Sequence, residues 1–207
     1  MAKKSPQAKK SVATKQTTDW GRGAGGRAVN RPIPSSSFEE SEAFARAVYE
    51  TGSGRPVRRI TVFDQISKSP ESSASRLLVT NSGKYGLIKG SYKAEMLEPS
   101  ADAIQIFDER VSAKDRARAR VKLAIENIPV LAALYEKLKE LKLPPRAALL
   151  DLARDVGVPK EYLEEAVDTF LVNLRSVGLL KNLSGAERIV TIDHMLDAAP
   201  NNAPGSV

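Results

Sequence analysis

The chain of 207 residues contains no cysteine and one histidine, His194. Without cysteine the chain has no disulfide framework and no thiolate zinc site. We therefore expect the protein in a reducing compartment, the cytoplasm, where association with the nucleoid is one option. We interpret His194, beside Asp193, as structural. No stretch approaches the roughly 18 uninterrupted apolar residues of a membrane-spanning helix, and the N-terminus lacks the apolar run of a secretory signal.

Motifs of common enzyme classes are missing as well. The chain has no phosphate loop, no H-E-x-x-H zinc motif and no G-x-S-x-G nucleophile turn. Gly21, Gly23 and Gly26 have the spacing of a dinucleotide fingerprint, but neither a strand before them nor a helix after them is predicted. We therefore expect a protein that is not an enzyme and that carries no cofactor and no metal.

Positive charge is concentrated at the N-terminus. Residues 1–35 hold eight basic side chains and one acidic one, whereas the rest of the chain holds 24 of each sign, so the net charge of +7 lies on this segment. Because core-forming residues are scarce there, we predict a disordered basic tail over residues 1–36. Such a tail attracts nucleic acid through counterion release without reading its sequence. Residues 197–207 are predicted to form a disordered C-terminus.

Part of the tail has a more specific composition. Residues 19–27, DWGRGAGGR, combine Trp20 with Arg-Gly pairs. Tails of this kind bind RNA or single strands by stacking an aromatic ring on the bases. A plain flexible linker is the alternative interpretation.

A first folded unit is predicted over residues 37–98. Apolar spacing and turn formers indicate a helix over 38–51, a short helix over 61–66, a third helix capped by Ser69, and a hairpin around Gly90. In the third helix the predicted apolar stripe consists of Ala74, Leu77, Leu78 and Tyr85. The opposite side is rich in hydroxyls and poor in acid.

This order of elements resembles a winged helix-turn-helix domain. The segment of residues 72–88, SSASRLLVTNSGKYGLI, is similar to the recognition helix and first wing strand of small bacterial winged-helix proteins of unassigned function. The resemblance spans about residues 41–97. It implies that the third helix enters the major groove and that the wing contacts the DNA backbone. A merely solvated polar helix is the alternative. The nucleic-acid-binding residues that it implies are Ser72, Ser73, Ser75, Arg76, Asn81, Lys84, Lys89, Lys93, Arg58 and Arg59.

Residues 99–142 are predicted to form a helical connector. Its basic residues around Arg118 could bind phosphate, but acids lie nearby and a solvated helix is the favoured interpretation.

A second unit, predicted over residues 143–196, repeats the pattern of the first. It comprises a helix over 145–156, a helix that begins at Pro159, and a hairpin that turns at Ser184 and Gly185. Gly-Leu-aliphatic-Lys follows the last helix of both units, as YGLIKG at residues 85–90 and VGLLKN at residues 177–182. This unit also resembles a winged helix.

Charge distinguishes the two units. Between Pro159 and Val177 the chain has four acidic and two basic side chains, so this helix is unsuited to a DNA groove. Its apolar stripe is favoured as core, with dimerisation or partner binding as the alternative.

The sequence thus predicts a mostly α fold with small β-hairpin wings: an N-terminal winged helix-turn-helix unit, a helical linker and a second winged-helix-like unit. The predicted function is regulatory or architectural binding of duplex DNA, with the second unit used for homodimerisation or a protein partner. One alternative is a winged-helix protein-protein interaction subunit of a larger assembly. Another is RNA or single-strand binding through the tail.

Overall fold

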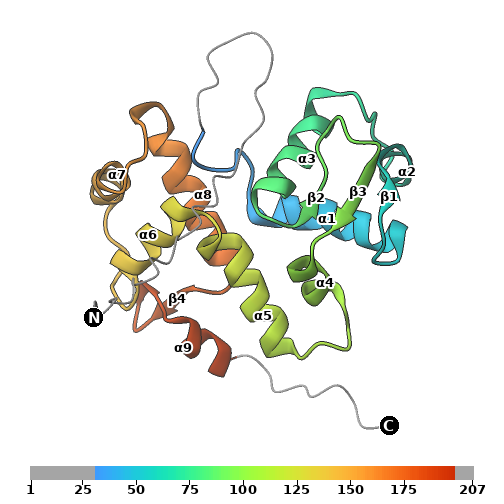
Figure 1. The fold of residues 1–207 in the computed structure, drawn as a ribbon. Helices are drawn as coiled ribbons and strands as arrows, with labels where there is room; N and C mark the ends of the chain where they lie inside the picture. Colours follow the sequence, from blue (N-terminus) through green and yellow to red (C-terminus); the bar gives the residue numbers. More distant parts are fainter. Residues whose placement is uncertain (1–30, 199–207) are drawn as a thin grey trace, which may run out of the picture. The chain divides into compact units, whose positions relative to one another are not determined.

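The computed structural model of the protein describes residues 31–198, so the prediction for residues 1–30 and that for residues after 198 lie outside the described residues. The described part is mostly helical with small antiparallel sheets, as predicted (Figure 1). None of the helices in residues 31–198 is long and apolar enough to cross a membrane.

The first half runs from α1 to β3. Strand β3 lies between the other two strands and is antiparallel to both, with Val57 opposite Leu97 and Ile88 opposite Pro99. Helix α3 lies beside this sheet (Figure 1). The elements in chain order are α1 (Phe38–Gly52), β1 (Val57–Arg58), α2 (Arg59–Gln65), α3 (Ser73–Lys84), β2 (Ile88–Lys89) and β3 (Met96–Pro99).

Two helices connect this half to the second one. Helix α5 continues directly into a π-helical turn, whose residues Leu123, Ala124 and Ile125 are buried. The remaining elements are α4 (Ala101–Phe107), α5 (Ala113–Val121), the π-turn (Lys122–Glu126), α6 (Pro129–Leu138), α7 (Arg146–Asp155), a 3-10 turn (Lys160–Tyr162), α8 (Leu163–Ser176), β4 (Leu180–Leu183), β5 (Ala186–Ile189) and α9 (Ile192–Asp197).

Residues 140–143, just before the predicted boundary at residue 143, bind a strand that follows it. Glu140 N–H donates to the Ile189 carbonyl at 2.7 Å, Leu143 N–H donates to the Glu187 carbonyl at 2.8 Å, and Lys142 forms a bridge with Arg188 of β5. We therefore count the second half from α6. With the segment 140–143 in the place of β1, the second half follows the helix and strand order of the first, and β5 pairs with β4 on one side and with Lys142 on the other.

The repeated Gly-Leu-aliphatic-Lys motif performs the same geometric task twice. Gly86 and Gly178 adopt φ of 78° and 79°, a left-handed conformation that suits glycine at the end of a helix. The next residue returns to the helix: Leu87 N–H donates to the Ser82 carbonyl at 2.9 Å, and Leu179 N–H to the Leu174 carbonyl at 2.8 Å. Both leucines are fully buried, so each motif closes a helix and starts a strand.

Serine and threonine begin five of the helices. Ser37, Ser100, Ser112 and Thr191 each accept a hydrogen bond from the backbone N–H three residues later, and Ser72 does the same for α3. The predicted cap of α3, Ser69, is therefore wrong by three residues.

Residues 31–37 belong to the folded part, although the sequence assigned residues up to 36 to a disordered tail. Ile33 is fully buried, and Lys84 Nζ donates to its carbonyl at 3.2 Å. Tyr85 Oη donates to the Ser36 carbonyl at 2.8 Å. The segment was misassigned because a single buried isoleucine gives little periodic signal.

Candidate nucleic-acid interface

The exposed surface of α3 differs from the predicted one. Ala74 and Leu77, expected in the apolar stripe, are exposed, and Leu77 retains 52% of its accessible surface. The helix instead buries Leu78, Val79 and Tyr85 together with polar residues. The outward side carries Ser73, Ala74, Arg76, Leu77 and Thr80.

Ser75 and Asn81 were predicted to contact DNA, but both are buried. Ser75 Oγ donates to the Ser69 carbonyl at 2.5 Å and accepts from Ser72 Oγ at 2.9 Å, which fastens the turn before α3. Asn81, 2% exposed, accepts a hydrogen bond from Ser35 N–H at 3.0 Å. Their amide and hydroxyl groups already satisfy internal partners, so neither can reach a base in this conformation.

Lys84 and Arg59 are also engaged in the fold. Lys84 is half-buried, and this burial, with the charge of Arg31 nearby, lowers the pKa of the Lys84 ammonium. The Arg59 side chain is only 12% exposed and donates to the Pro70 carbonyl at 2.8 Å and the Ala94 carbonyl at 3.3 Å. Arg59 thereby ties the start of α3 to the β2–β3 hairpin. Arg59 therefore holds α3 and the hairpin together, and little of its own side chain is left exposed.

A further ion pair completes this junction. Glu71 Oε1 lies 2.8 Å from Arg59 Nη2, and the hydrogen bond and charge of Arg59 hold the pKa of the Glu71 carboxyl below its usual range. Arg76 lies 3.5 Å from the other Glu71 oxygen, at the weak end of contact, and keeps half of its side chain exposed.

Tyr92, which sequence reasoning did not select, joins α3 to the hairpin loop. The Arg76 guanidinium and the Lys93 ammonium each lie 5.7 Å from the centroid of its ring. We call Arg76, Tyr92 and Lys93 the Tyr92 cluster. It brings two cations and an aromatic face together, which is the chemistry that binds phosphates and stacks on bases. The sequence did contain a signal for this cluster, because Tyr92 lies between Lys89 and Lys93 in the predicted hairpin.

The remaining predicted residues flank this cluster. Ser72 and Ser73 stand at the start of α3, with Ser73 exposed. Lys89 lies 3.2 Å from Glu98, and Arg58 lies 3.6 Å from Glu95, in pairs that are largely solvent-exposed. Because exposed pairs are worth little, a phosphate can compete for these cations.

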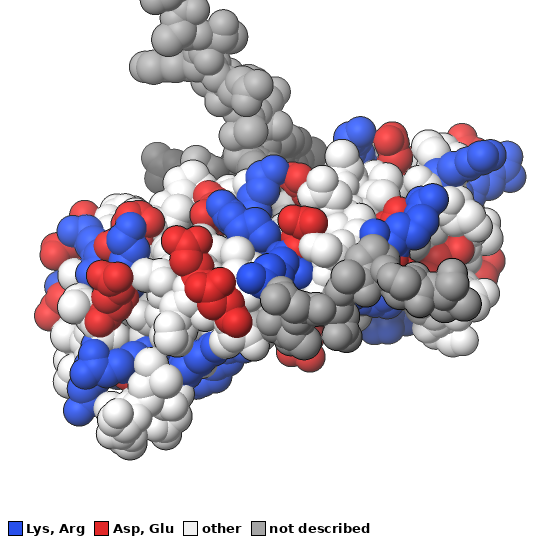
Figure 2. Space-filling view, turned by 90° about the horizontal axis from the view of Figure 1, so that it is seen from below, with Lys and Arg blue, Asp and Glu red and all other residues white. Residues whose placement is uncertain are grey.

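The acidic helix α8 is largely neutralised by the fold. Arg146 of α7 binds both Glu164 and Asp168, and these hydrogen bonds, led by the one to Asp168, raise the pKa of the guanidinium. Arg31 forms an ion pair with Glu165. On the face in Figure 2, basic and acidic side chains are interspersed.

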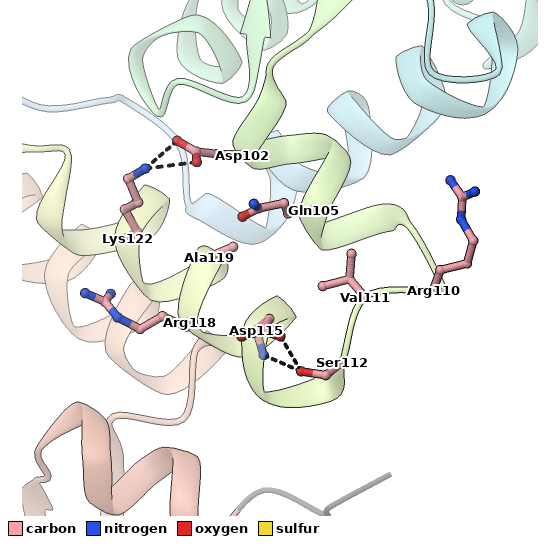
Figure 3. A pocket seen from close by; sticks show the side chains of 9 residues that line it. All are labelled: Asp102, Gln105, Arg110, Val111, Ser112, Asp115, Arg118, Ala119 and Lys122. Atoms are coloured by element: carbon pink, nitrogen blue, oxygen red, sulfur yellow. Dashed lines mark hydrogen bonds and ion pairs between the residues drawn. The ribbon is translucent and has the colours of Figure 1, made fainter. Parts of the chain in front are cut away.

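A polar cleft of about 680 Å³ lies between α4 and α5 (Figure 3). Its cations are already paired: Lys122 Nζ contacts both Asp102 oxygens at 2.9 Å, and Arg118 Nη1 lies 2.8 Å from Glu126. Ser112 Oγ donates to Asp115 at 2.6 Å. The exposed Arg110 likewise pairs with Asp108, so each cation that lines the cleft has a carboxylate partner, whereas Asp115 is in no ion pair among residues 31–198.

Residues 31–198 contain no group of three or more His, Asp or Glu side chains that could hold a metal ion. His194 is exposed, and its backbone N–H is bound by the capping Thr191. Comparisons of the chain with models of protein families, with curated proteins and with solved structures gave no match.

Proposed function

We propose that the first half is a winged helix that binds duplex DNA with the outward side of α3 and the β2–β3 hairpin. The element order α1-β1-α2-α3-β2-β3 and the strand order β1-β3-β2 support the winged helix. The observation that carries the function is the Tyr92 cluster, where Arg76 of α3 and Lys93 of the hairpin meet on one aromatic ring.

Under this proposal the residues have different tasks. Arg76 and Ser73 lie on the outward side of α3, where a guanidinium can bridge guanine and a hydroxyl can bind base or phosphate. Lys93, Lys89 and Arg58 flank the helix and suit phosphate contacts. The acid nearest to the cluster, Glu71, is held by Arg59, which reduces its repulsion of DNA.

Fluorescence anisotropy with a labelled duplex tests this function on the full chain. Arg76→Ala is expected to weaken binding to a preferred sequence by about 1–3 kcal/mol, as the loss of one bidentate base contact does. Lys93→Ala should weaken binding to all sequences and make the salt dependence shallower by about 0.9. Arg55→Ala is the matched control, because Arg55 is exposed in the same half and lies outside the cluster.

Two results would reject the proposal. One is the absence of duplex affinity at low salt, where nonspecific binding is strongest. The other is an Arg76→Ala variant that binds like the Arg55→Ala control.

Protein binding is the second candidate function, and exposed apolar side chains favour it. Ile60, Leu77 and Met96 keep 58%, 52% and 43% of their surface, on α2, α3 and β3 of the same half. Side chains of this size in such positions are typical of contact surfaces when they are contiguous. Under this candidate, Leu77→Gln abolishes association with a protein partner while Arg76→Ala leaves duplex affinity unchanged.

A further inference from the structure

Three basic residues lie in register across the sheet of the second half. Arg188 of β5 stands directly opposite Lys181 of β4 on one side and opposite Lys142, with which it forms an isolated antiparallel bridge, on the other. Residues that stand opposite each other in antiparallel strands point to the same face of the sheet. Lys142, Arg188 and Lys181 therefore form one continuous row, which we call the basic row.

The row faces outward. The neighbouring pair Leu180 and Ile189 is buried, so the alternate residues Lys181 and Arg188 point away from the core. Lys142 and Arg188 are exposed, and Lys181 is partly exposed.

Among residues 31–198, no carboxylate forms an ion pair with these cations. Most arginines of residues 31–198 have a carboxylate partner, yet none of the ion pairs among these residues includes a member of the basic row. The nearest acid in the strand, Glu187, points to the opposite face and lies 3.3 Å from Arg175 of α8.

Stability does not account for the row. Like charges directly opposite each other in a sheet are destabilising, and the central Arg188 has a like-charged neighbour on both sides. An arrangement that costs stability and has no internal partner indicates an external one of negative charge.

We propose that the basic row binds the sugar-phosphate backbone of nucleic acid. Neighbouring strands lie about 4.8 Å apart, so the row extends over about 10 Å. Successive phosphates of one strand advance about 3.4 Å along the helix axis, so a row of this length reaches about three of them. This inference goes beyond the proposed function, because it gives the second half its own contact and does not require α3.

Another negatively charged candidate to occupy the row is the acidic α8 of a second copy of the chain. Two of its exposed acids, Glu164 and Asp168, are already bound by Arg146, so they offer less charge than a phosphate backbone. Nucleic acid is the better complement.

The test compares salt dependence of binding in full-length variants. The triple variant Lys142→Gln, Lys181→Gln, Arg188→Gln removes the row without adding acid. Anisotropy titrations against a duplex and against a single strand, each at several salt concentrations, give the slope of log K against log salt. We expect the duplex slope to become shallower by about 0.9 for each lost phosphate contact, up to about 2.7 in all. A larger change of the slope with the single strand than with the duplex would indicate that the row binds single-stranded nucleic acid.

A control triple variant removes the same charge elsewhere. Arg55→Gln, Lys137→Gln and Lys160→Gln change three exposed cations that lie outside the row and form no ion pair among residues 31–198. Equal slopes in the two triple variants, or no change in the row variant, would overturn the inference. If circular dichroism shows that the row variant is unfolded, Arg188→Gln alone replaces it, with an expected change of about 0.9.

The two proposals fail independently. Loss of affinity in the row variant with normal binding by Arg76→Ala supports the row and rejects the α3 interface, and the reverse pattern rejects the row. Self-association at low salt that the row variant abolishes, without any change in nucleic-acid binding, would assign the row to a second copy and overturn the inference.

Discussion

Replacing Asn173 by alanine should destabilise the whole folded part. Asn173 lies on α8 and is fully buried. Its Oδ1 accepts from Phe38 N–H at 2.9 Å, and its Nδ2 donates to the Ala124 carbonyl and to Tyr85 Oη, both at 3.1 Å. One amide thus holds the start of α1, the π-turn and the end of α3.

The magnitude follows from the groups left behind. Truncation removes three hydrogen bonds and leaves the Phe38 N–H and the Ala124 carbonyl buried without their partner, at about 1–3 kcal/mol for each unsatisfied group. We expect a loss of about 2–6 kcal/mol, the sum for the two groups, against a total stability on the order of 5–15 kcal/mol. In a folded part of this size the midpoint of thermal unfolding should fall by roughly 4–24 °C.

Urea denaturation followed by far-ultraviolet circular dichroism measures this loss. Asn182→Ala is the matched control, because Asn182 is exposed on β4 and surface changes of this kind stay within about 0.5 kcal/mol. Since Asn173 joins both halves, the wild-type chain should unfold in one transition. A loss below about 1 kcal/mol, or separate transitions of the two halves in the wild type, would refute the reasoning.

Three other variants probe single contacts. Arg59→Met should cost about 1–3 kcal/mol in chemical denaturation, because it frees two backbone carbonyls at the junction of α3 and the hairpin; an unchanged midpoint would contradict this role. Burial raises the pKa of Tyr135 to about 12, so its contribution to stability is present below pH 10 and is lost between about pH 10 and 12; Tyr135→Phe should remove this alkaline loss in pH-dependent melts. Arg188→Gln should stabilise the fold by about 0.2–1 kcal/mol, since it relieves like-charge repulsion, and a lower melting temperature would count against the register.

The regular elements of both halves could be predicted because their signals are local. Hydroxyl caps, apolar spacing and the left-handed glycines Gly86 and Gly178 depend on a few neighbouring residues. The hairpin turn at Ser184 and Gly185 was likewise predicted, and both residues have positive φ. The pairing of the short strand β1 depends on β3, a partner that lies about 40 residues later in the sequence.

The orientation of α3 could not be predicted, because it depends on contacts distant in sequence. Ser75 and Asn81 were predicted to be polar surface residues. Both are buried, and they form hydrogen bonds with the backbone of Ser69 and Ser35 respectively. A polar residue is buried when a backbone group from elsewhere satisfies it, and no pattern along the helix reveals that partner. The N-cap at Ser72 belongs to the turn between Ser69 and Ser75, which is closed by the hydrogen bond from Ser75 Oγ to the Ser69 carbonyl.

Asn81 and Asn173 occupy equivalent positions in the two halves and contact the same segment of the chain. Each stands five residues before the glycine that ends its helix, and each side chain binds the backbone of the same entering segment, at Ser35 and at Phe38. Equivalent asparagines of the two halves therefore both accept hydrogen bonds from residues 35–38. Because these hydrogen bonds engage the C-terminal part of both helices, the nucleic-acid contacts that we propose use the outward start of α3 and the hairpins, which remain exposed.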